Sequence, residues 1–523
     1  MNTNVDINHE LNRLIGFAAA HGLTGPDDSI WAANSLIGTL GVHSFQPEEP
    51  GTEEREELTR MISPEPILER ILDWAVGQGL IEDTSTDRDL LDTKLMGLLT
   101  PRPSNVISCF NTLKTASPQK ATDWFYELGI ASNYIRSART ARNICWKTAT
   151  EFGELDITIN LSKPEKDPRD IARARTVPSS GYPKCLLCRE NEGFFGHQGH
   201  PARQNLRLIP LNFHGKDWYL QYSPYSYYNE HCIVLGRDHV PMRISRATFE
   251  NLLGFITQFP HYFLGSNADL PIVGGSILSH DHYQGGRYVF AMEKAPIEEE
   301  YALAPNVKAG RVKWPLSALR LTSPDAEALI GLACRVLEQW RSWSDPSVGV
   351  LAESDGEPHN TITPIARRRS GDYELDLVLR NNRTSEEHPL GIFHPHAEVH
   401  HIKKENIGLI EVMGLAVLPP RLKGALEAMA EAWTRGEDDL SARPELAAHD
   451  VWYRGLRQRY LDRSRRGADR SRRGAVGLAP EAVPGMLRDE VGHVFAQVLS
   501  DSGVYKRTPE GLAAFDRFVM SLK

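Results

Sequence analysis

Two histidines and a glutamine stand at alternate positions in Gly274-Gly-Ser-Ile-Leu-Ser-His280-Asp-His282-Tyr-Gln284-Gly-Gly286. Alternate side chains of a strand share one face, so His280, His282 and Gln284 are expected to point the same way. A neutral imidazole is a good nucleophile toward phosphorus near neutral pH, and the phosphorus-bound ring is a good leaving group. The amide of Gln284 can donate to a phosphoryl oxygen but cannot act as a base toward water. The pattern therefore favours group transfer to a second substrate over hydrolysis.

A purely structural role is an alternative interpretation of the same residues. His280 and His282 would also suit a buried position in which both rings bond to backbone groups. The glycine pairs favour a site, because residues without a Cβ let a ligand approach the backbone. The absence of a P-loop, and of Gly-x-Gly-x-x-Gly after a predicted strand, counts against P-loop kinases and Rossmann dehydrogenases.

A candidate metal site begins with Cys185-x-x-Cys188. A tetrahedral zinc site needs four ligands, and the chain has no second Cys-x-x-Cys pair to supply the other two. His239, in Gly236-Arg-Asp-His-Val-Pro241, and His280 are the candidates. A redox pair is a weaker alternative, because no βαβ pattern surrounds the cysteines. Two thiols packed as small hydrophobes are a third interpretation.

A second group of histidines occurs in Phe393-His-Pro-His-Ala-Glu-Val-His400. On a strand, His394, His396, Glu398 and His400 would share one face and the apolar residues the other. Three imidazoles and a carboxylate are ligand types of a metal site. The same face could instead bind a substrate, for which His396 is the candidate, or be solvated.

The composition is that of a folded protein without a membrane span. The chain has 523 residues, 41% hydrophobic and 24% charged, with a net charge of −9. This acidic balance counts against general binding to nucleic acid or membrane surfaces. The best apolar run, 407–420, contains Glu411, and the first residues lack the pattern of a signal peptide. Six cysteines are too few for a disulfide scaffold, so a reducing, cytoplasmic setting is expected.

Residues 1–165 are expected to form a mainly helical region. The apolar spacing predicts helices over 64–77 and 87–99. Near 154–161 the spacing falls to two, and two prolines then mark a boundary near residue 165.

Strands and helices mix from 166 to 305 and again from 306 to 435. Each part contains one long predicted helix, over 248–258 and 325–343. The strand candidates are 206–211, 218–222, 232–235, 272–278 and 287–292 in the first part, and strands near 311–321, from Thr361 and over 373–379 in the second. The mixture is a coarse internal repeat in which each copy ends in a His-x-His pentapeptide.

The last part, 436–523, contains a literal duplication. Asp462-Arg-Ser-Arg-Arg-Gly-Ala468 is followed by the same residues from Asp469 to Ala475. A solvated loop is expected here, and a patch that binds an anion or nucleic acid is the alternative. Helices over 484–499 and 509–522 are expected to pack back on the body of the protein.

The combination of motifs resembles the galactose-1-phosphate uridylyltransferase family, in its longer bacterial type 2 form. The motifs are the glycine-flanked His-Asp-His-Tyr-Gln, Cys185-Leu-Leu-Cys-Arg-Glu-Asn191 and Phe393-His-Pro-His-Ala-Glu-Val-His-His-Ile-Lys-Lys404. The resemblance extends from about Pro101 to Pro420. It implies an α+β fold in which two histidine-triad-like halves share one antiparallel sheet flanked by helices. A helical N-terminal region and a helical C-terminal tail are added to these halves.

The resemblance also implies a double displacement in galactose metabolism. His282 would attack the α-phosphorus of UDP-glucose and release glucose 1-phosphate, and galactose 1-phosphate would then take the uridylyl group to give UDP-galactose. Gln284 would hold the phosphoryl oxygens. The implied substrate contacts are Asn212, Gly275, Ser276, Ser279 and His396. The implied ligands of a structural zinc ion are Cys185, Cys188, His239 and His280. The likeness suggests a homodimer, and no organic cofactor is expected.

The sequence departs from the better known form of the family at three places. Asp281 stands where that form has proline between its two histidines. Leu415-Ala416 stand where it has a Tyr-Glu pair that contacts the hexose, so an N-acetylhexosamine 1-phosphate is an alternative acceptor. Glu398 stands where it has a histidine of a second metal site.

Two other functions are alternatives. A histidine-triad nucleotide hydrolase or dinucleotide phosphorylase would use His282 on another nucleotide, although Gln284 argues against hydrolysis. A nucleotide-binding protein would instead recruit RNA through its Arg-rich tail. Exchange of UDP-sugars with hexose 1-phosphates would separate the family reaction from the first alternative, and deletion of 462–475 would test the second.

Overall fold

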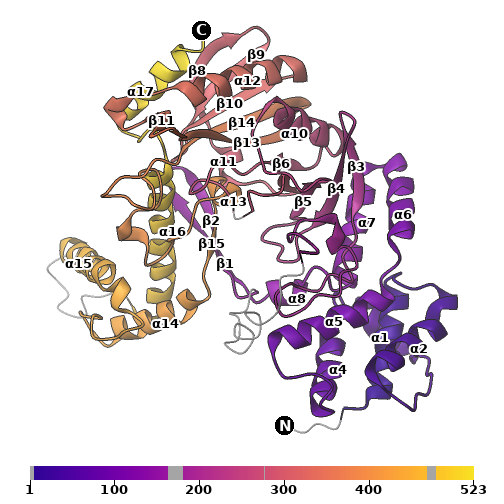
Figure 1. Ribbon diagram of the computed structural model, residues 1–523. Helices are drawn as coiled ribbons and strands as arrows, with labels where there is room; N and C mark the ends of the chain where they lie inside the picture. Colours follow the sequence, from indigo (N-terminus) through magenta and orange to yellow (C-terminus); the bar gives the residue numbers. More distant parts are fainter. Residues whose placement is uncertain (1–4, 163–180, 276, 468–478) are drawn as a thin grey trace.

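The computed structural model describes residues 5–162, 181–275, 277–467 and 479–523. Its centre is a ten-stranded sheet in the order β3-β4-β5-β7-β6-β13-β14-β10-β9-β8 (Figure 1). All neighbouring strands of this sheet pair in the antiparallel sense. The predicted α+β class and the single large antiparallel sheet are therefore confirmed.

The sheet consists of two halves with the same order of elements. The first half contains β3 (Ile209–Phe213), β4 (Lys216–Tyr222), β5 (Cys232–Gly236), α10 (Arg246–Gln258), β6 (Phe263–Gly265) and β7 (His282–Gly286). The second contains β8 (Ile297–Ala304), β9 (Val307–Val312), β10 (Ala318–Ser323), α12 (Ala326–Ser342), β13 (Asn360–Arg369) and β14 (Asp372–Asn381). The halves join where β6 pairs with β13, with Gly265 opposite Ile365. Because β6 and β13 are equivalent and antiparallel, the two halves are related by a local two-fold axis.

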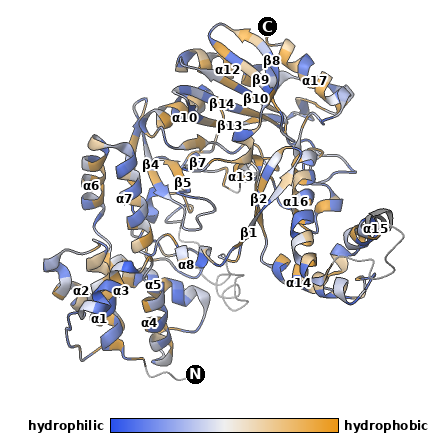
Figure 2. Cartoon of the chain, turned by 180° about the vertical axis from the view of Figure 1, so that it is seen from behind, coloured by the Kyte–Doolittle hydropathy of each residue, from blue (hydrophilic) through white to orange (hydrophobic). Residues whose placement is uncertain are grey.

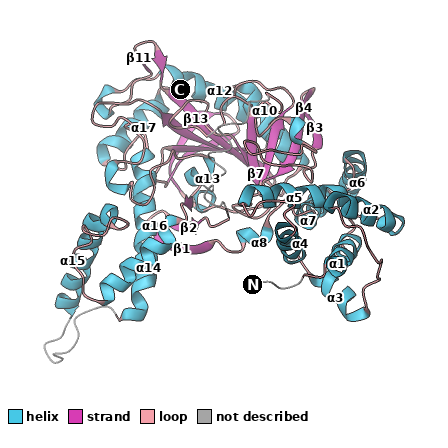
Figure 3. Ribbon diagram, turned by 60° about the horizontal axis from the view of Figure 1, so that its bottom comes forward, coloured by secondary structure: helices cyan, strands magenta, loops and turns pink. Residues whose placement is uncertain are grey.

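The two faces of the sheet are covered differently. Helices α10 and α12 pack on each other and on β13, so they lie on the same face (Figure 3). Tyr283 belongs to the apolar cluster on this face, and its hydroxyl accepts a hydrogen bond from Asn251 of α10 at 3.1 Å. Because strand residues alternate, His282 and Gln284 point to the opposite face. A second apolar cluster, which includes Phe263, lies there.

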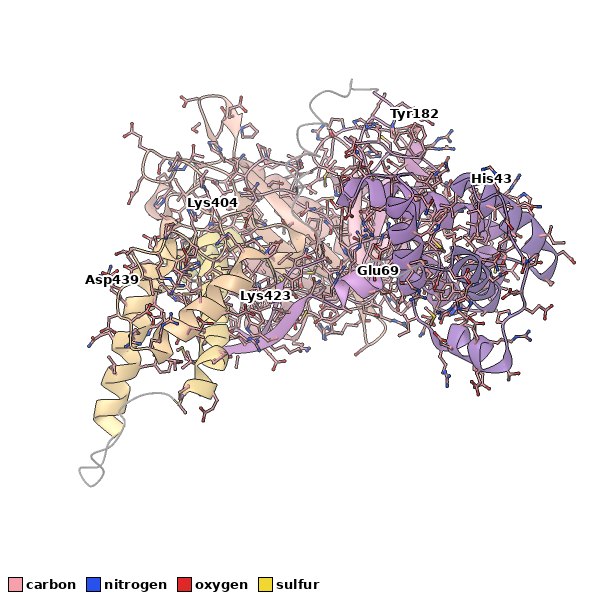
Figure 4. The ribbon with its side chains drawn as sticks, turned by 90° about the horizontal axis from the view of Figure 1, so that it is seen from below. His43, Glu69, Tyr182, Lys404, Lys423 and Asp439 are labelled. Atoms are coloured by element: carbon pink, nitrogen blue, oxygen red, sulfur yellow. The ribbon has the colours of Figure 1, made fainter. Side chains whose placement is uncertain are left out.

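The N-terminal region is a group of amphipathic helices, in which Figure 2 shows hydrophilic and hydrophobic residues together. The helices are α1 (Ile7–Ala20), α2 (Ser29–Leu40), α3 (Thr52–Arg60), α4 (Glu65–Gly77), α5 (Ser85–Leu99), α6 (Pro103–Ala116), α7 (Pro118–Ala131) and α8 (Ser137–Thr140). Helices α4 and α5 confirm the predictions over 64–77 and 87–99. Figure 4 shows His43 of this region toward one end of the molecule and Asp439 toward the other.

The end of the predicted helical region is a hairpin instead. Strands β1 (Ile144–Thr150) and β2 (Gly153–Ile159) pair with each other, and β2 pairs in parallel with β15 (Leu415–Leu418). Residues 144–159 therefore pack with the C-terminal part of the chain. The period of two near 154–161 indicated a strand, but nothing in the sequence indicated its distant partner. Leu415 and Ala416 are buried in this small sheet.

The C-terminal part is mainly helical. Its helices are α13 (Leu409–Val412), α14 (Arg421–Thr434), α15 (Asp450–Gly467), α16 (Val483–Ser502) and α17 (Pro509–Met520). Helices α16 and α17 confirm the last two predicted helices. Most of the first Arg-rich copy is the end of α15 rather than a loop, and the second copy lies outside the described residues. Within the described ranges, no helix has the length and apolar character needed to cross a membrane.

Two predicted strands of the first half are wrong. The described part of 272–278 is not in a strand, and Ile272 has φ +73°. The segment 287–292 leaves the sheet after Gly286, which has φ +152°, and ends in α11 (Ala291–Lys294). Phe290 and Met292 are buried in the second apolar cluster. A short apolar run buried on all sides cannot be told from a strand by periodicity alone.

Candidate active site

Four predicted metal ligands come together from three separate loops. Donor atoms of Cys185, Cys188, His239 and His280 all lie within 4.8 Å of one another. The Sγ atoms are 3.6 Å apart, Cys185 Sγ is 3.4 Å from His280 Nδ1, and Cys188 Sγ is 3.2 Å from His239 Nδ1. Ligands roughly 2.0–2.3 Å from a tetrahedral ion lie roughly 3.3–3.8 Å apart. The cluster could therefore hold one metal ion.

Groups around the cluster hold its ligands in place. The Nε2–H of His280 donates to the carbonyl oxygen of Gly236 at 2.8 Å, which leaves Nδ1 free to face the cluster. The amide of Asn191 donates to the carbonyl oxygens of Cys185 and Cys188, both at 2.8 Å. Burial raises the pKa of Cys188 to about 11. Burial also acts to raise the pKa of Cys185, but hydrogen bonds, chiefly with His280, outweigh it and lower that pKa.

His282 begins β7 and is 6% exposed. Its Nδ1–H donates to the carbonyl oxygen of His280 at 2.9 Å, so Nε2 carries the lone pair. Burial lowers the pKa of His282 to about 4, which keeps the ring neutral near pH 7. The ring thus has the tautomer and the fixed orientation of a nucleophile. His280 serves both sites, because its side chain belongs to the metal cluster and its carbonyl oxygen holds His282.

Gln284 lies two residues along the same face. The sequence analysis missed two polar residues near the motif, of which one contacts Gln284 and the other lies against Gly275. His231 is buried, with Nε2 3.2 Å from Oε1 of Gln284. Asn267 is buried and accepts the backbone N–H of Leu409 at 2.9 Å. Neither belongs to a motif, and only the tertiary structure brings them close to it. No sequence signal marked them.

The glycines around the motif have packing reasons in the structure. A Cβ on Gly275 would lie 2.6 Å from Nδ2 of Asn267. A Cβ on Gly285 would lie 2.4 Å from the carbonyl oxygen of Phe263 on the neighbouring strand. Close approach of protein segments therefore explains these glycines, where the sequence suggested approach by a ligand.

Gly285→Ala is expected to lower the free energy of unfolding by about 1–3 kcal/mol, because β6 must move away from the new methyl group. The matched control is Gly331→Ala in the middle of α12, where a Cβ would meet nothing within 4 Å. That change is expected to be neutral or to stabilise by about 0.5–1 kcal/mol. Denaturant titrations of both variants make the comparison. Equal effects at the two positions would contradict the assigned contact.

Asp281, between the two histidines of the motif, has a backbone role. Its N–H donates to the carbonyl oxygen of Val240 at 2.8 Å, and its carbonyl oxygen accepts the N–H of Gly236 at 2.9 Å. Proline has no N–H and would lose the first bond. These bonds tie the loop that carries His239 to the start of β7.

The structure does not bring all predicted substrate contacts to His282. Asn212 lies in the β3–β4 hairpin, where its side chain bonds to Asp217 and to the N–H of Gly215 at 3.3 and 3.1 Å. Strand β3 is three strands from β7, about 14 Å at the usual spacing. Ser279 is exposed beside His280, and Ser276 lies outside the described residues.

The second histidine group is not on a strand. It forms a loop with the short 3-10 helix Ala397–Val399, and Pro395 cannot donate to a sheet ladder. His394 bonds to Asn406 at 3.2 Å, whereas the ring of His396 stacks on that of His388 at 4.2 Å. In the described ranges, the cluster of Cys185, Cys188, His239 and His280 is the only grouping suited to a metal. The second metal site considered from the sequence is not formed there.

The equivalent strand of the second half carries different chemistry. Strand β14 occupies the place of β7, and its Asp376 is held by Arg320 at 2.6 and 2.9 Å and also by Arg367. Arg367 also donates to Glu374 at 2.6 Å. The fold is thus repeated, but the expected repeat of the histidine motif is wrong, because the second His-x-His follows β14 in a loop.

The chain is similar to a known family of proteins along most of its length. Residues 35–241 match the family described as galactose-1-phosphate uridyl transferase, N-terminal domain, and residues 255–450 match its C-terminal domain. A protein of Clostridium acetobutylicum called galactose-1-phosphate uridylyltransferase is 54% identical over 98% of this chain and 99% of its own length. Proteins of the same name from Caldanaerobacter subterraneus subsp. tengcongensis and Halalkalibacterium halodurans are 52% and 50% identical, over 99% and 98% of this chain and 98% of each relative.

A solved structure with some likeness is yeast Ap4A phosphorylase Apa2. It is 12% identical, with a TM-score of 0.31, over 59% of this chain and 91% of that one. The full-length relatives have much higher sequence identity to this chain, 50–54%. Together with the two matched domains, it shows that this chain belongs to the galactose-1-phosphate uridyl transferase family.

Proposed function

We propose that this protein transfers the uridylyl group from UDP-glucose to galactose 1-phosphate by a double displacement through His282. The observation that carries the proposal is the geometry of His282 and Gln284 within a chain of this family. The Nδ1–H of His282 is fixed by a carbonyl oxygen, its Nε2 has no hydrogen-bond partner in the described part of the chain, and an amide follows on the same face. This arrangement supplies a nucleophile without placing a second basic side chain next to it on the strand.

In the first step, Nε2 of His282 attacks the α-phosphorus of UDP-glucose. An N–P bond forms, the bridging P–O bond breaks, and glucose 1-phosphate leaves with that electron pair. In the second step, a phosphate oxygen of galactose 1-phosphate attacks the same phosphorus and the N–P bond breaks, which gives UDP-galactose and free His282. The second pKa of a phosphate monoester is about 6. Glucose 1-phosphate is therefore stable as an anion near pH 7 and can leave without taking up a proton. The amide N–H groups of Gln284 can stabilise the phosphoryl oxygens in both steps.

We also propose that the metal bound by Cys185, Cys188, His239 and His280 is zinc. Two thiolates and two imidazoles are a usual donor set for structural zinc. When bound, zinc would fix the loop that precedes β7, and all four positions would be filled by protein. Both cysteines contact the ring of His280, and the carbonyl oxygen of the same residue accepts the hydrogen bond of His282. All six cysteines are free thiols, which suits a reducing compartment such as the cytoplasm.

The test uses wild-type protein and UDP-glucose labelled in the α-phosphate, without an acceptor. We expect an acid-labile label on the chain and a burst of about one glucose 1-phosphate per site. Galactose 1-phosphate should then discharge the label as UDP-galactose, and N-acetylgalactosamine 1-phosphate serves as the competing acceptor. Continuous release without trapped label would instead indicate a hydrolase. Consumption of adenosine dinucleotides with phosphate would indicate a phosphorylase, and binding without any turnover a nucleotide-binding protein.

A further inference from the structure

His231 lies directly before β5 and contacts Gln284 on the neighbouring strand β7. The residue is 3% exposed, and Nε2 lies 3.2 Å from Oε1 of Gln284. Its ring packs near those of Tyr227 and Tyr228, with centroids 5.5 and 4.5 Å away. The ring therefore has a fixed position beside the amide.

The proton of His231 belongs on Nε2. Burial lowers the pKa of His231 to about 4, so the ring is neutral near pH 7 and carries one N–H. Its Nδ1 has no hydrogen-bond partner among the described residues. A proton on Nδ1 would leave a buried donor unpaired, which costs free energy. A proton on Nε2 is paired with Oε1 of Gln284.

The segment that carries His231 is itself anchored to the end of β7. The hydroxyl of Tyr228 donates to the carbonyl oxygen of Gly285 at 3.1 Å. Glu230 is 1% exposed and has φ +53°. Its carboxylate accepts a hydrogen bond from Tyr262 and pairs with Arg287, just after β7. These bonds hold the segment that carries His231 against the end of β7.

We propose that His231 is a positioning residue for group transfer. Its Nε2–H holds Oε1 of Gln284, so that the NH2 group of this amide is left to bind a phosphoryl oxygen. Without His231 the amide of Gln284 can rotate by half a turn and present its oxygen instead, which would repel the phosphoryl oxygens. This inference rests on the proposed function and adds to it the group that sets the direction of the amide.

A double-mutant cycle tests the inference with the full chain. His231→Phe keeps a ring in the buried position and removes the donor, and we expect kcat to fall about 10- to 100-fold with little change in KM for UDP-glucose. Gln284→Leu removes the amide at similar size, and we expect a larger loss of about 10²–10³. In the Gln284→Leu background, His231→Phe should cause no further loss of kcat, because His231 acts only through that amide.

Two further variants separate positioning from stability. His231→Gln restores a donor, so it should recover most of the kcat that His231→Phe loses. His359→Phe removes another buried, hydrogen-bonded imidazole, paired with Asn382 at 2.8 Å. It should lower the melting temperature to a similar extent and leave kcat unchanged.

The outcomes distinguish this inference from the proposed function. If wild-type protein transfers the uridylyl group but the His231 and Gln284 losses multiply, His231 acts independently of Gln284 and the inference is overturned. A His231→Gln variant as slow as His231→Phe would also overturn it. If the wild-type protein does not exchange UDP-glucose with hexose 1-phosphates, the proposed function itself has failed.

Discussion

His282→Asn is expected to abolish uridylyl transfer, with kcat lower by about 10⁴-fold or more, as when other enzymes lose their nucleophile. Nδ1 of this ring bonds to the carbonyl oxygen of His280, whereas Nε2 has no hydrogen-bond partner among the described residues. Asparagine can keep a hydrogen bond to that oxygen but cannot form the N–P bond. The labelled UDP-glucose burst measures the effect, and label and burst should both disappear.

His359→Asn is the matched control for this change, because it also replaces a buried histidine by asparagine. It should keep the burst and the exchange of hexose 1-phosphates. A His282→Asn variant that still exchanged the two sugars, at a rate within tenfold of the wild type, would show that the acceptor attacks UDP-glucose directly. The double displacement would then be wrong, although the family assignment would stand.

Loss of the candidate metal cluster is expected to lower both the stability of the protein and its kcat. Wild-type protein should contain about one zinc per chain, and Cys188→Ser should remove it and lower the free energy of unfolding by about 4 kcal/mol or more. The loops before β3, after β5 and before β7 meet at the cluster. Because His280 also orients His282, kcat should fall about 10- to 100-fold in the folded variant. Metal analysis, thermal unfolding and the burst assay measure the three effects.

Cys145→Ser is the control, since Cys145 is an exposed free thiol outside the cluster. That variant should keep its zinc, stability and activity. Metal-free wild-type protein with full activity and an unchanged melting temperature would contradict the zinc assignment. Zinc loss that lowers stability but leaves kcat unchanged would contradict the coupling through His280.

The candidate chemistry could be predicted from the sequence because it depends on residue types at short spacing. His280, His282 and Gln284 lie within five consecutive residues, and two residues separate Cys185 from Cys188. The missing second Cys-x-x-Cys pair indicated histidines as the other two zinc ligands, and the resemblance to the family implied His239 and His280. The helices α4, α5, α16 and α17 were likewise predictable, since their apolar residues recur at helical spacing.

Other features of the structure were predicted wrongly from the sequence or could not be predicted from it. The segment after Phe393 has the alternation of a strand, but Pro395 and local hydrogen bonds make it a loop. The hairpin of residues 144–159 finds its third strand near residue 415. His231 reaches Gln284 only because β5 and β7 are neighbours, with Ile233 opposite Gln284.

The sequence by itself thus determined the nucleophile candidate, the candidate metal ligands and most of the long helices. The tertiary structure decided which distant segments pair, how the halves join at β6 and β13, and which groups contact Gln284 and His282. The physical reason is that spacing and residue type record the local conformation and the available chemistry. Strand partners and the contacts of buried polar groups are instead fixed by packing between segments far apart in the chain, which no local pattern records.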